Sequence, residues 1–151
     1  MQDSLPRPWD ASRLPEPVIP FERTFEAFLA LEWLELTPSC ARVRFETRDD
    51  LKQPLGLLHG GIYCAVAETV ASLATAYEVW EDGLVASGLS NSANFLRPIT
   101  AGTVHVACRL RERGDDAWLW STDFRDEADR LCAIVDVMVA VRPVPADVPS
   151  S

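Results

Sequence analysis

Residues 53–77 read QPLGLLHGGIYCAVAETVASLATAY, and this stretch decides how the rest of the chain is interpreted. A quarter of the chain is charged, so 25 average residues would carry about six charges, whereas this stretch carries one formal charge, at Glu68. The apolar residues after His59 have helical spacing, so we expect a helix that begins there and is buried nearly all round. Gly60, Gly61 and Glu68 interrupt the run, which falls short of the ~20 apolar residues that span a membrane.

Glu68 is an isolated carboxylate on this apolar helix. The helical spacing places Ser72 and Thr75 on the same stripe as Glu68. Burial of a lone ionised carboxylate is unfavourable, so Glu68 must have a partner, a proton or contact with water. The structural alternative is that the edge of the helix meets solvent and that Glu68 only solvates it.

His59, Gly60 and Gly61 stand directly before the expected helix. Glycine allows a ligand to approach the backbone closely, and a helix N-terminus offers unpaired N–H groups at a positive dipole end. Such a place can polarise a carbonyl group. The structural alternatives are a tight turn for the two glycines and a hydrogen-bonded loop histidine for His59. The other histidine, His105, is expected at an exposed position on a strand.

The composition limits the kinds of partner. The chain has 151 residues, which fits one domain, and its 14 Lys and Arg against 23 Asp and Glu give a net charge of −9. An acidic surface repels phosphate backbones, so we expect no nucleic-acid partner. The N-terminus has neither a basic start nor an apolar stretch, so we expect no signal peptide, no membrane association and a cytoplasmic location.

The cysteines and histidines do not form a metal-binding pattern. The four cysteines are far apart in the sequence and no CxxC is present, so each is expected to be a small buried residue in a reducing compartment. With two histidines, we expect no protein metal site. No GxSxG, HExxH, P-loop or GxGxxG motif is present either.

Prolines are concentrated at both ends of the chain. Five of the eleven lie in residues 1–20 and three in residues 143–149, and proline fixes φ and lacks a backbone donor. We therefore expect a proline-rich N-terminal arm over 1–20, one packed domain over 21–142 and a proline-rich C-terminal tail over 143–151.

Periodicity predicts the elements of the packed domain. Apolar residues at helical spacing predict a short amphipathic helix over 21–29. Between Gly83 and Leu96 the alternation is weak, and only the ends of this segment suit an extended conformation. Short turns make neighbouring strands antiparallel. The alternation of apolar and polar residues predicts strands over 41–45, 104–110 and 118–124. A run rich in β-branched residues predicts a central strand over 131–139, and a further strand is expected over 31–36.

Three segments carry a resemblance to a known family. Gln53 stands six residues before His59, and Glu68 stands nine residues after it. The matching segments are Gln53 to Gly61, Ala67-Glu68-Thr69 with Ser72, and Asn94-Phe95-Leu96-Arg97-Pro98 with Gly102. From roughly Phe25 to Arg142, the chain resembles the hotdog-fold acyl-CoA thioesterases of the phenylacetate-pathway and 4-hydroxybenzoyl-CoA type.

The resemblance implies an α+β hotdog fold, in which an antiparallel β-sheet is wrapped around a long central α-helix. It also implies hydrolysis of an aryl- or medium-chain acyl-CoA to the free acid and coenzyme A. No cofactor is implied, because coenzyme A is part of the substrate. Two subunits of such enzymes join their sheets, with active sites at the interface, so we expect a homodimer or a homotetramer built as a dimer of dimers.

The resemblance further implies roles for individual residues. Glu68 corresponds to the catalytic carboxylate, either as nucleophile or as general base toward water. The backbone N–H of Gly60 corresponds to the donor that binds the thioester carbonyl oxygen. His59 and Gln53 correspond to groups that orient the thioester or the water, and Ser72 to the hydroxyl that helps to position the carboxylate or the water.

Substrate contacts are implied for Gly61, Asn94, Phe95 and Arg97. Arg97 is the candidate to meet a coenzyme A phosphate or to brace the pantetheine channel, with a structural salt bridge as the alternative. Some relatives carry histidines just before the Arg-Pro pair, where this chain has Phe95 and Leu96. Nucleotide contacts at that point are therefore left open.

Two other functions remain open at this stage. A hotdog enoyl-CoA hydratase or dehydratase would use a histidine and a carboxylate as acid and base, but His59 precedes the helix as it does in the hydrolases. A non-catalytic acyl-CoA-binding module on the same fold is the other alternative, because fold alone does not fix function. Glu68 argues against it, since a binder has no need of an unpaired carboxylate beside the thioester.

Overall fold

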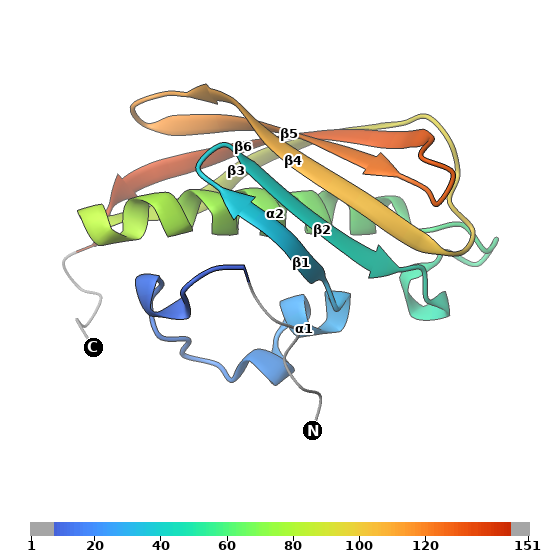
Figure 1. The fold of residues 1–151 in the computed structure, drawn as a ribbon, viewed down its shortest axis with the longest axis horizontal. Helices are drawn as coiled ribbons and strands as arrows, with labels where there is room; N and C mark the ends of the chain where they lie inside the picture. Colours follow the sequence, from blue (N-terminus) through green and yellow to red (C-terminus); the bar gives the residue numbers. More distant parts are fainter. Residues whose placement is uncertain (1–7, 146–151) are drawn as a thin grey trace.

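The structure, a computed structural model, describes residues 8–145 as one six-stranded antiparallel sheet curled around one long helix (Figure 1). The strand order across the sheet is β1-β2-β4-β5-β6-β3. This is the α+β hotdog architecture expected from the resemblance. The strands are β1 (Glu32–Thr37), β2 (Cys40–Glu46), β3 (Leu84–Phe95), β4 (Thr103–Arg113), β5 (Ala117–Arg125) and β6 (Leu131–Pro143). The helices are α1 (Phe25–Leu29) and α2 (Gly60–Val79), with 3-10 turns η1 (Ala11–Arg13), η2 (Phe21–Arg23), η3 (Asp49–Leu51) and η4 (Trp80–Asp82).

The hydrophobic core lies between α2 and the face of the sheet that packs on it. On β5, every second side chain from Trp118 to Phe124 is buried, and on β6 Val135, Val137 and Val139 have no exposed surface. Successive side chains of a strand point to opposite faces, so the alternation in the sequence places one face of each strand on the helix. The predicted strands, and their antiparallel pairing, are confirmed.

β3 is the element that the sequence predicted least well. It is a continuous twelve-residue strand, not two short extended ends, and it pairs with β6 at the edge of the sheet. The register shifts by one residue between Gly88 and Ser90, which marks a β-bulge at Leu89. Most side chains of this edge strand are exposed, so they alternate too little for periodicity to reveal the strand.

The amphipathic helix predicted over 21–29 is wrong in its extent. The segment is divided at Thr24 into η2 and α1, and the Thr24 hydroxyl caps α1 by accepting the N–H of Ala27. Threonine favours a cap over a helix interior, which explains the division. The phenylalanines of this segment are exposed and only Leu29 is buried, so the apolar spacing here does not mark a core-facing stripe.

The prediction that α2 is buried nearly all round is wrong for the single chain. Eight residues on the side of the sheet are buried, whereas Gly61 and Glu68 are exposed. The physical reason is that one sheet covers one side of a helix. No helix within residues 8–145 is long and apolar enough to cross a membrane.

One buried hydrogen-bond chain ties α2 to the sheet. Thr75 Oγ1 accepts the indole N–H of Trp120 at 2.9 Å and donates to the Ala71 carbonyl oxygen at 2.8 Å. Both Thr75 and Trp120 are fully buried. Thr75 therefore faces the core, and its predicted place beside Glu68 and Ser72 is corrected.

Replacement of Thr75 by valine is expected to lower the free energy of unfolding by about 1–3 kcal/mol. Valine has the same shape, but it leaves the buried indole N–H of Trp120 without an acceptor. Urea unfolding followed by tryptophan fluorescence measures the change. Thr75→Ser keeps the hydroxyl and is the matched control, and a Thr75→Val protein as stable as wild type would contradict the prediction.

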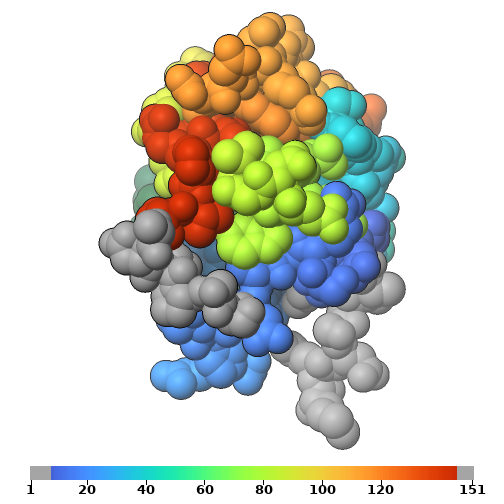
Figure 2. Space-filling view, turned by 90° about the vertical axis from the view of Figure 1, so that its left-hand side faces the viewer, coloured from blue at the N-terminus to red at the C-terminus, as the bar shows by residue number. Residues whose placement is uncertain are grey.

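The N-terminal segment packs at the C-terminal end of α2. Arg13 lies 4.2 Å from the ring centroid of Tyr77, and its Nε lies 3.0 Å from Oε2 of Glu81. Figure 2 shows this end of the helix between the N-terminal segment below and the β4–β5 turn above. The division of the chain at 20 and 142 stays a prediction, and residues 1–7 and 146–151 lie outside the described residues.

The four cysteines are free thiols. Cys108 and Cys132 are buried as expected, whereas Cys40 and Cys64 are only partly buried. Burial raises the pKa of the Cys108 thiol to about 12. Among residues 8–145, no group of three or more His, Cys, Asp or Glu side chains is placed to hold a metal ion.

Candidate active site

The site begins where the loop after η3 turns into α2. The His59 N–H donates to the Leu51 carbonyl oxygen, and the His59 ring caps the helix because its Nδ1 accepts the Gly61 N–H at 2.9 Å. The Gly60 N–H meets no acceptor among residues 8–145. It is one of the unpaired N–H groups at the positive end of the α2 dipole, so it can bind an oxygen that develops negative charge.

Gln53 holds the loop that leads to this helix start. Its side-chain Oε1 accepts the Leu55 N–H at 2.8 Å, and its backbone N–H donates to the Leu57 carbonyl oxygen. The carboxamide oxygen is therefore used within the turn, and the Nε2 donors have no hydrogen-bond partner among residues 8–145, while Gln53 itself lines the cavity.

A cavity of about 340 Å³ opens in front of Gly60. It is polar where Gln53 and Arg97 line it and apolar elsewhere. A cavity that is mainly apolar, with few polar groups, is typical of a small-molecule site. The remaining lining residues are Leu57, Leu58, Tyr63, Phe95, Leu96 and Pro98.

Three aromatic rings connect the cavity to the core. Phe95 and Tyr63 meet edge to face with ring centroids 5.4 Å apart, and Tyr63 meets Phe124 in the same way at 5.1 Å. A Cβ atom at Gly60 would lie 3.1 Å from Phe95 Cζ, so glycine lets the Phe95 ring cover the helix start. Phe95 is itself 56% exposed, and its other face is open to a ligand.

Burial raises the pKa of the Tyr63 phenol to about 12. The unfolded chain ionises its tyrosine near pH 10, so the native state binds the proton more tightly between these values. We expect the free energy of unfolding to fall between about pH 10 and 12, by at most about 1.4 kcal/mol per pH unit, because a single proton is bound more tightly in the native state. Chemical denaturation should show a shallower alkaline fall for Tyr63→Phe, and equal slopes would contradict this prediction.

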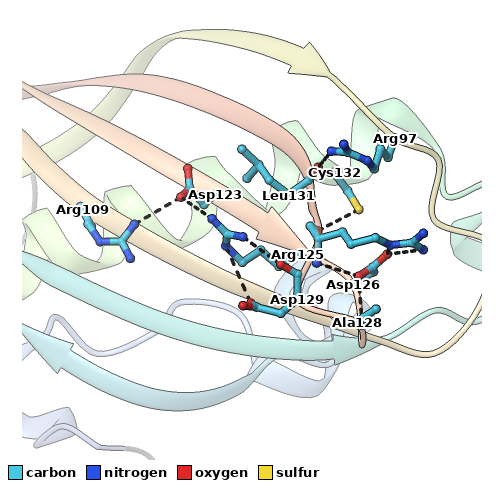
Figure 3. A network of polar contacts seen from close by, with 10 residues as sticks. Arg97, Arg109, Asp123, Arg125, Asp126, Ala128, Asp129, Leu131 and Cys132 are labelled. Atoms are coloured by element: carbon cyan, nitrogen blue, oxygen red, sulfur yellow. Dashed lines mark hydrogen bonds and ion pairs between the residues drawn. The ribbon is translucent and has the colours of Figure 1, made fainter.

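Arg97 is held at the rim of the cavity by Leu131 and Cys132, the first residues of β6, directly after the β5–β6 turn. Its Nη1 donates to the Leu131 carbonyl oxygen at 2.8 Å, and its backbone N–H donates to Cys132 (Figure 3). The turn itself is fixed by Asp126, whose carboxylate pairs with Arg130 at 2.7 Å. The hydrogen bond from Arg130 holds the pKa of Asp126 below its usual value, so the turn stays charged and ordered at neutral pH. Within residues 8–145 Arg97 forms no salt bridge. The guanidinium group therefore still has N–H donors that can bind an anion.

Glu68 lies two turns along α2, away from the cavity. It is exposed in the single chain, and its carboxylate rests against β3. Gly60 and Glu68 are eight residues apart, which corresponds to about 12 Å of helix rise. The structure therefore does not bring the candidate carbonyl-binding N–H and the candidate carboxylate together within one chain.

Four other predicted site residues do not line the cavity, and one of them is His59, the cap of α2. Gly61 is exposed, and its N–H is used by His59. Asn94 pairs with Ile134 and points to the face of β3 opposite that of Phe95. Ser72 follows Glu68 by one turn, and its Oγ is buried without a partner among the described residues. An unsatisfied buried hydroxyl of this kind is suited to hold a water molecule.

The sequence also suggested Tyr63, Phe95 and Leu96 as lining residues of an acyl pocket, and all three line the cavity. The sequence analysis did not assign Gly88 or Asn91 to the site, and both contact the carboxylate of Glu68. Gly88 carried one usable signal, because glycine within a strand often marks a bulge or a close approach. Asn91 carried none, since its orientation depends on the bulge.

The sheet curled around one helix is the hotdog fold, the fold of a class of thioester hydrolases. A family model described as the thioesterase superfamily matches residues 55–133, just over half of the chain. The chain belongs to the thioesterase superfamily.

Curated and solved proteins agree with this assignment. A candidate esterase of Mycobacterium tuberculosis is 36% identical over 114 residues, which cover 72% of this chain and 79% of the relative. Its solved structure matches with a TM-score of 0.76 at 32% identity, over 80% of this chain and 98% of that one. The proofreading thioesterase EntH of Klebsiella pneumoniae is 31% identical over 80% of this chain and 87% of its own. A 1,4-dihydroxy-2-naphthoyl-CoA hydrolase of Listeria monocytogenes is 30% identical over 76% of this chain and 92% of its own.

Proposed function

We propose that this chain hydrolyses the thioester of an aryl- or medium-chain acyl-CoA to the free acid and coenzyme A. The observation that carries the proposal is the N–H of Gly60, which has no acceptor within residues 8–145 and belongs to a residue that lines a mainly apolar cavity at the positive end of α2. An aimed donor at the carbonyl oxygen stabilises the charge that develops in the transition state. The reaction takes no cofactor, since coenzyme A enters as part of the substrate.

We infer that the active site is completed by a second copy of the chain. A carbonyl group bound at Gly60 lies about 12 Å of helix rise from the Glu68 of its own chain, too far for direct attack. β3 supplies a surface for the second copy, because it is a long exposed edge without any charged side chain. Two copies joined at β3 would cover the exposed side of α2 and place the Glu68 of one chain near the Gly60 of the other. We propose a homodimer, and a tetramer as a dimer of such dimers.

In this scheme Glu68 is the nucleophile or the general base toward water. Gln53 lines the cavity and keeps free amide donors, which supports an orienting role. His59 acts mainly by capping the helix, because its Nδ1 holds the Gly61 N–H. Ser72 would hold the attacking water through its unpartnered hydroxyl.

The substrate is held at the cavity by Phe95 and Arg97. The open face of Phe95 and its edge-to-face contact with Tyr63 favour an aryl group or an apolar chain. The Listeria relative, by its name, hydrolyses an aryl-CoA, which supports the aryl class. Arg97 would meet a phosphate of coenzyme A with its remaining donors. Contacts of Gly61 and Asn94 with substrate, and a cytoplasmic location, stay predictions.

Release of coenzyme A, followed with a thiol reagent over a panel of aryl- and aliphatic acyl-CoA esters, tests the proposal. Hydrolysis of a subset by wild type supports it and begins to define the acyl group. Tight binding without release would favour a binding module instead. Hydration of an enoyl-CoA with the thioester intact would favour the hydratase. Light scattering on the same samples tests the dimer, and an active monomer would contradict the shared site.

A further inference from the structure

The carboxylate of Glu68 is seated against two residues of β3. Asn91 Nδ2 lies 3.5 Å from Glu68 Oε2 and is oriented to donate to it. A Cβ atom at Gly88 would lie only 2.5 Å from Glu68 Oε1 and 3.1 Å from Cδ. Glycine at 88 therefore leaves the space that the carboxylate occupies, and Asn91 supplies the hydrogen bond on its other oxygen.

The β-bulge of β3 is what brings Gly88 and Asn91 to the same face. Residues three apart in a regular strand point to opposite faces of the sheet. Here the bulge adds one residue, so that Gly88 pairs with Val139 and Asn91 pairs with Val137. Val137 and Val139 are both fully buried on the face that packs against α2. Bulges of this kind often re-aim a side chain beside an active site.

We propose that Asn91 is a positioning residue, which fixes the orientation of the Glu68 carboxylate for attack or proton abstraction. The inference rests on the proposed function and deepens it, because Asn91 acts through Glu68 and touches no substrate atom. An ionised carboxylate only accepts hydrogen bonds, and the amide of asparagine donates without adding charge. A neutral donor orients the carboxylate and leaves its negative charge available for the reaction.

Three substitutions at Asn91 separate donation from packing. Asn91→Leu keeps the volume and removes the donor, and we expect kcat to fall about tenfold, the effect of losing a hydrogen bond to a charged group. Asn91→Asp keeps the shape but turns an acceptor and a charge toward Glu68, and kcat should fall by a further factor of about ten. Asn91→Gln keeps the amide and should recover most of the rate. KM should change little, because the residue does not bind substrate.

Ser121 supplies the matched controls. It lies in the central strand β5, pairs with Asp136 and points to the face of the sheet opposite α2, away from the β3 edge. Ser121→Leu and Ser121→Asp introduce the same side chains there and should keep kcat within about twofold of wild type, as surface substitutions do. Circular dichroism and light scattering confirm that the variants share the fold and assembly of wild type.

The outcomes distinguish this inference from the proposed function. If wild type hydrolyses acyl-CoA and Glu68→Gln does not, equal rates for wild type, Asn91→Leu and Asn91→Asp would overturn the role of Asn91 alone. A rise in KM at unchanged kcat would also overturn it, since Asn91 would then be a substrate contact. If wild type and Glu68→Gln are equally active, the hydrolase function stands, but the catalytic role of Glu68 falls and the role of Asn91 falls with it, because Asn91 is assigned to act through Glu68. The inference is supported if kcat falls in the order wild type, Asn91→Gln, Asn91→Leu, Asn91→Asp.

Discussion

Replacement of Glu68 by glutamine is expected to lower kcat for acyl-CoA hydrolysis by about 10²–10⁴-fold, which is the usual contribution of a general base to the rate. Glutamine has nearly the same shape, and it cannot take a proton from water or attack the thioester. The side chain is exposed in the single chain, so the substitution should leave the fold intact. Single-turnover release of coenzyme A measures the loss.

Glu68→Asp is the companion variant. It keeps the charge but withdraws it by one methylene, away from Gly88 and Asn91. We expect partial activity if the carboxylate acts through water, because a water molecule can bridge the added distance, and near-complete loss if it attacks directly. Wild-type kcat in Glu68→Gln would remove Glu68 from the mechanism.

Gly60→Pro is expected to reduce kcat by about 10²–10³-fold, the usual effect of removing one oxyanion-hole donor. Proline removes the N–H of Gly60, which no other substitution at this position does. The fold should tolerate the change, because Gly60 is the first residue of α2, where proline is preferred and the N–H has no helical partner. His59 already has the extended conformation, ψ 134°, that a following proline requires.

Gly60→Ala is the control for the added carbon atoms. Its Cβ meets the same end of the Phe95 ring, 3.1 Å away, and that exposed ring can shift by a few tenths of an ångström. Alanine keeps the N–H, so most of the activity should remain. Thermal unfolding of both variants separates catalysis from stability. Equal activity of Gly60→Pro and Gly60→Ala would show that the N–H does not bind the carbonyl oxygen.

The sequence predicted the strands that have one face buried against the helix and the other face toward solvent. β2, β4 and β5 each have one face on the helix, so their apolar residues alternate. The start of α2 was predicted at His59 because glycines and a charge-poor run follow it, and His59 is the N-cap. β3 was not predicted as a whole, because most of its side chains are exposed, and exposed positions on an edge strand need not alternate between apolar and polar residues. The division at Thr24 was not predicted, because the apolar spacing over 21–29 favours one continuous helix, whereas Thr24 caps a new helix.

The sequence could predict only those residues of the candidate site whose role follows from their position along the chain. Gly60 and His59 act through the helix terminus, which the sequence reveals directly. Gly88 and Asn91 act through a bulge, and a single added residue reverses the face of every later side chain in a strand. The separation of Gly60 from Glu68 follows from helix rise alone, so the need for a second chain could have been derived from the sequence as well.

The order of strands in the sheet also sets an order of events during synthesis. β3 pairs with β6, and β6 begins at Leu131, 36 residues after β3 ends at Phe95. While the ribosome makes β4 and β5, α2 and β3 have already been synthesised but the neighbour of β3 does not yet exist. The pairing of β3 is thus a late, non-local step, which is slow compared with closure of the β4–β5 hairpin. The strand that seats Glu68 is the last to be fixed, so a nascent chain acquires its catalytic geometry only when its C-terminal strand is complete.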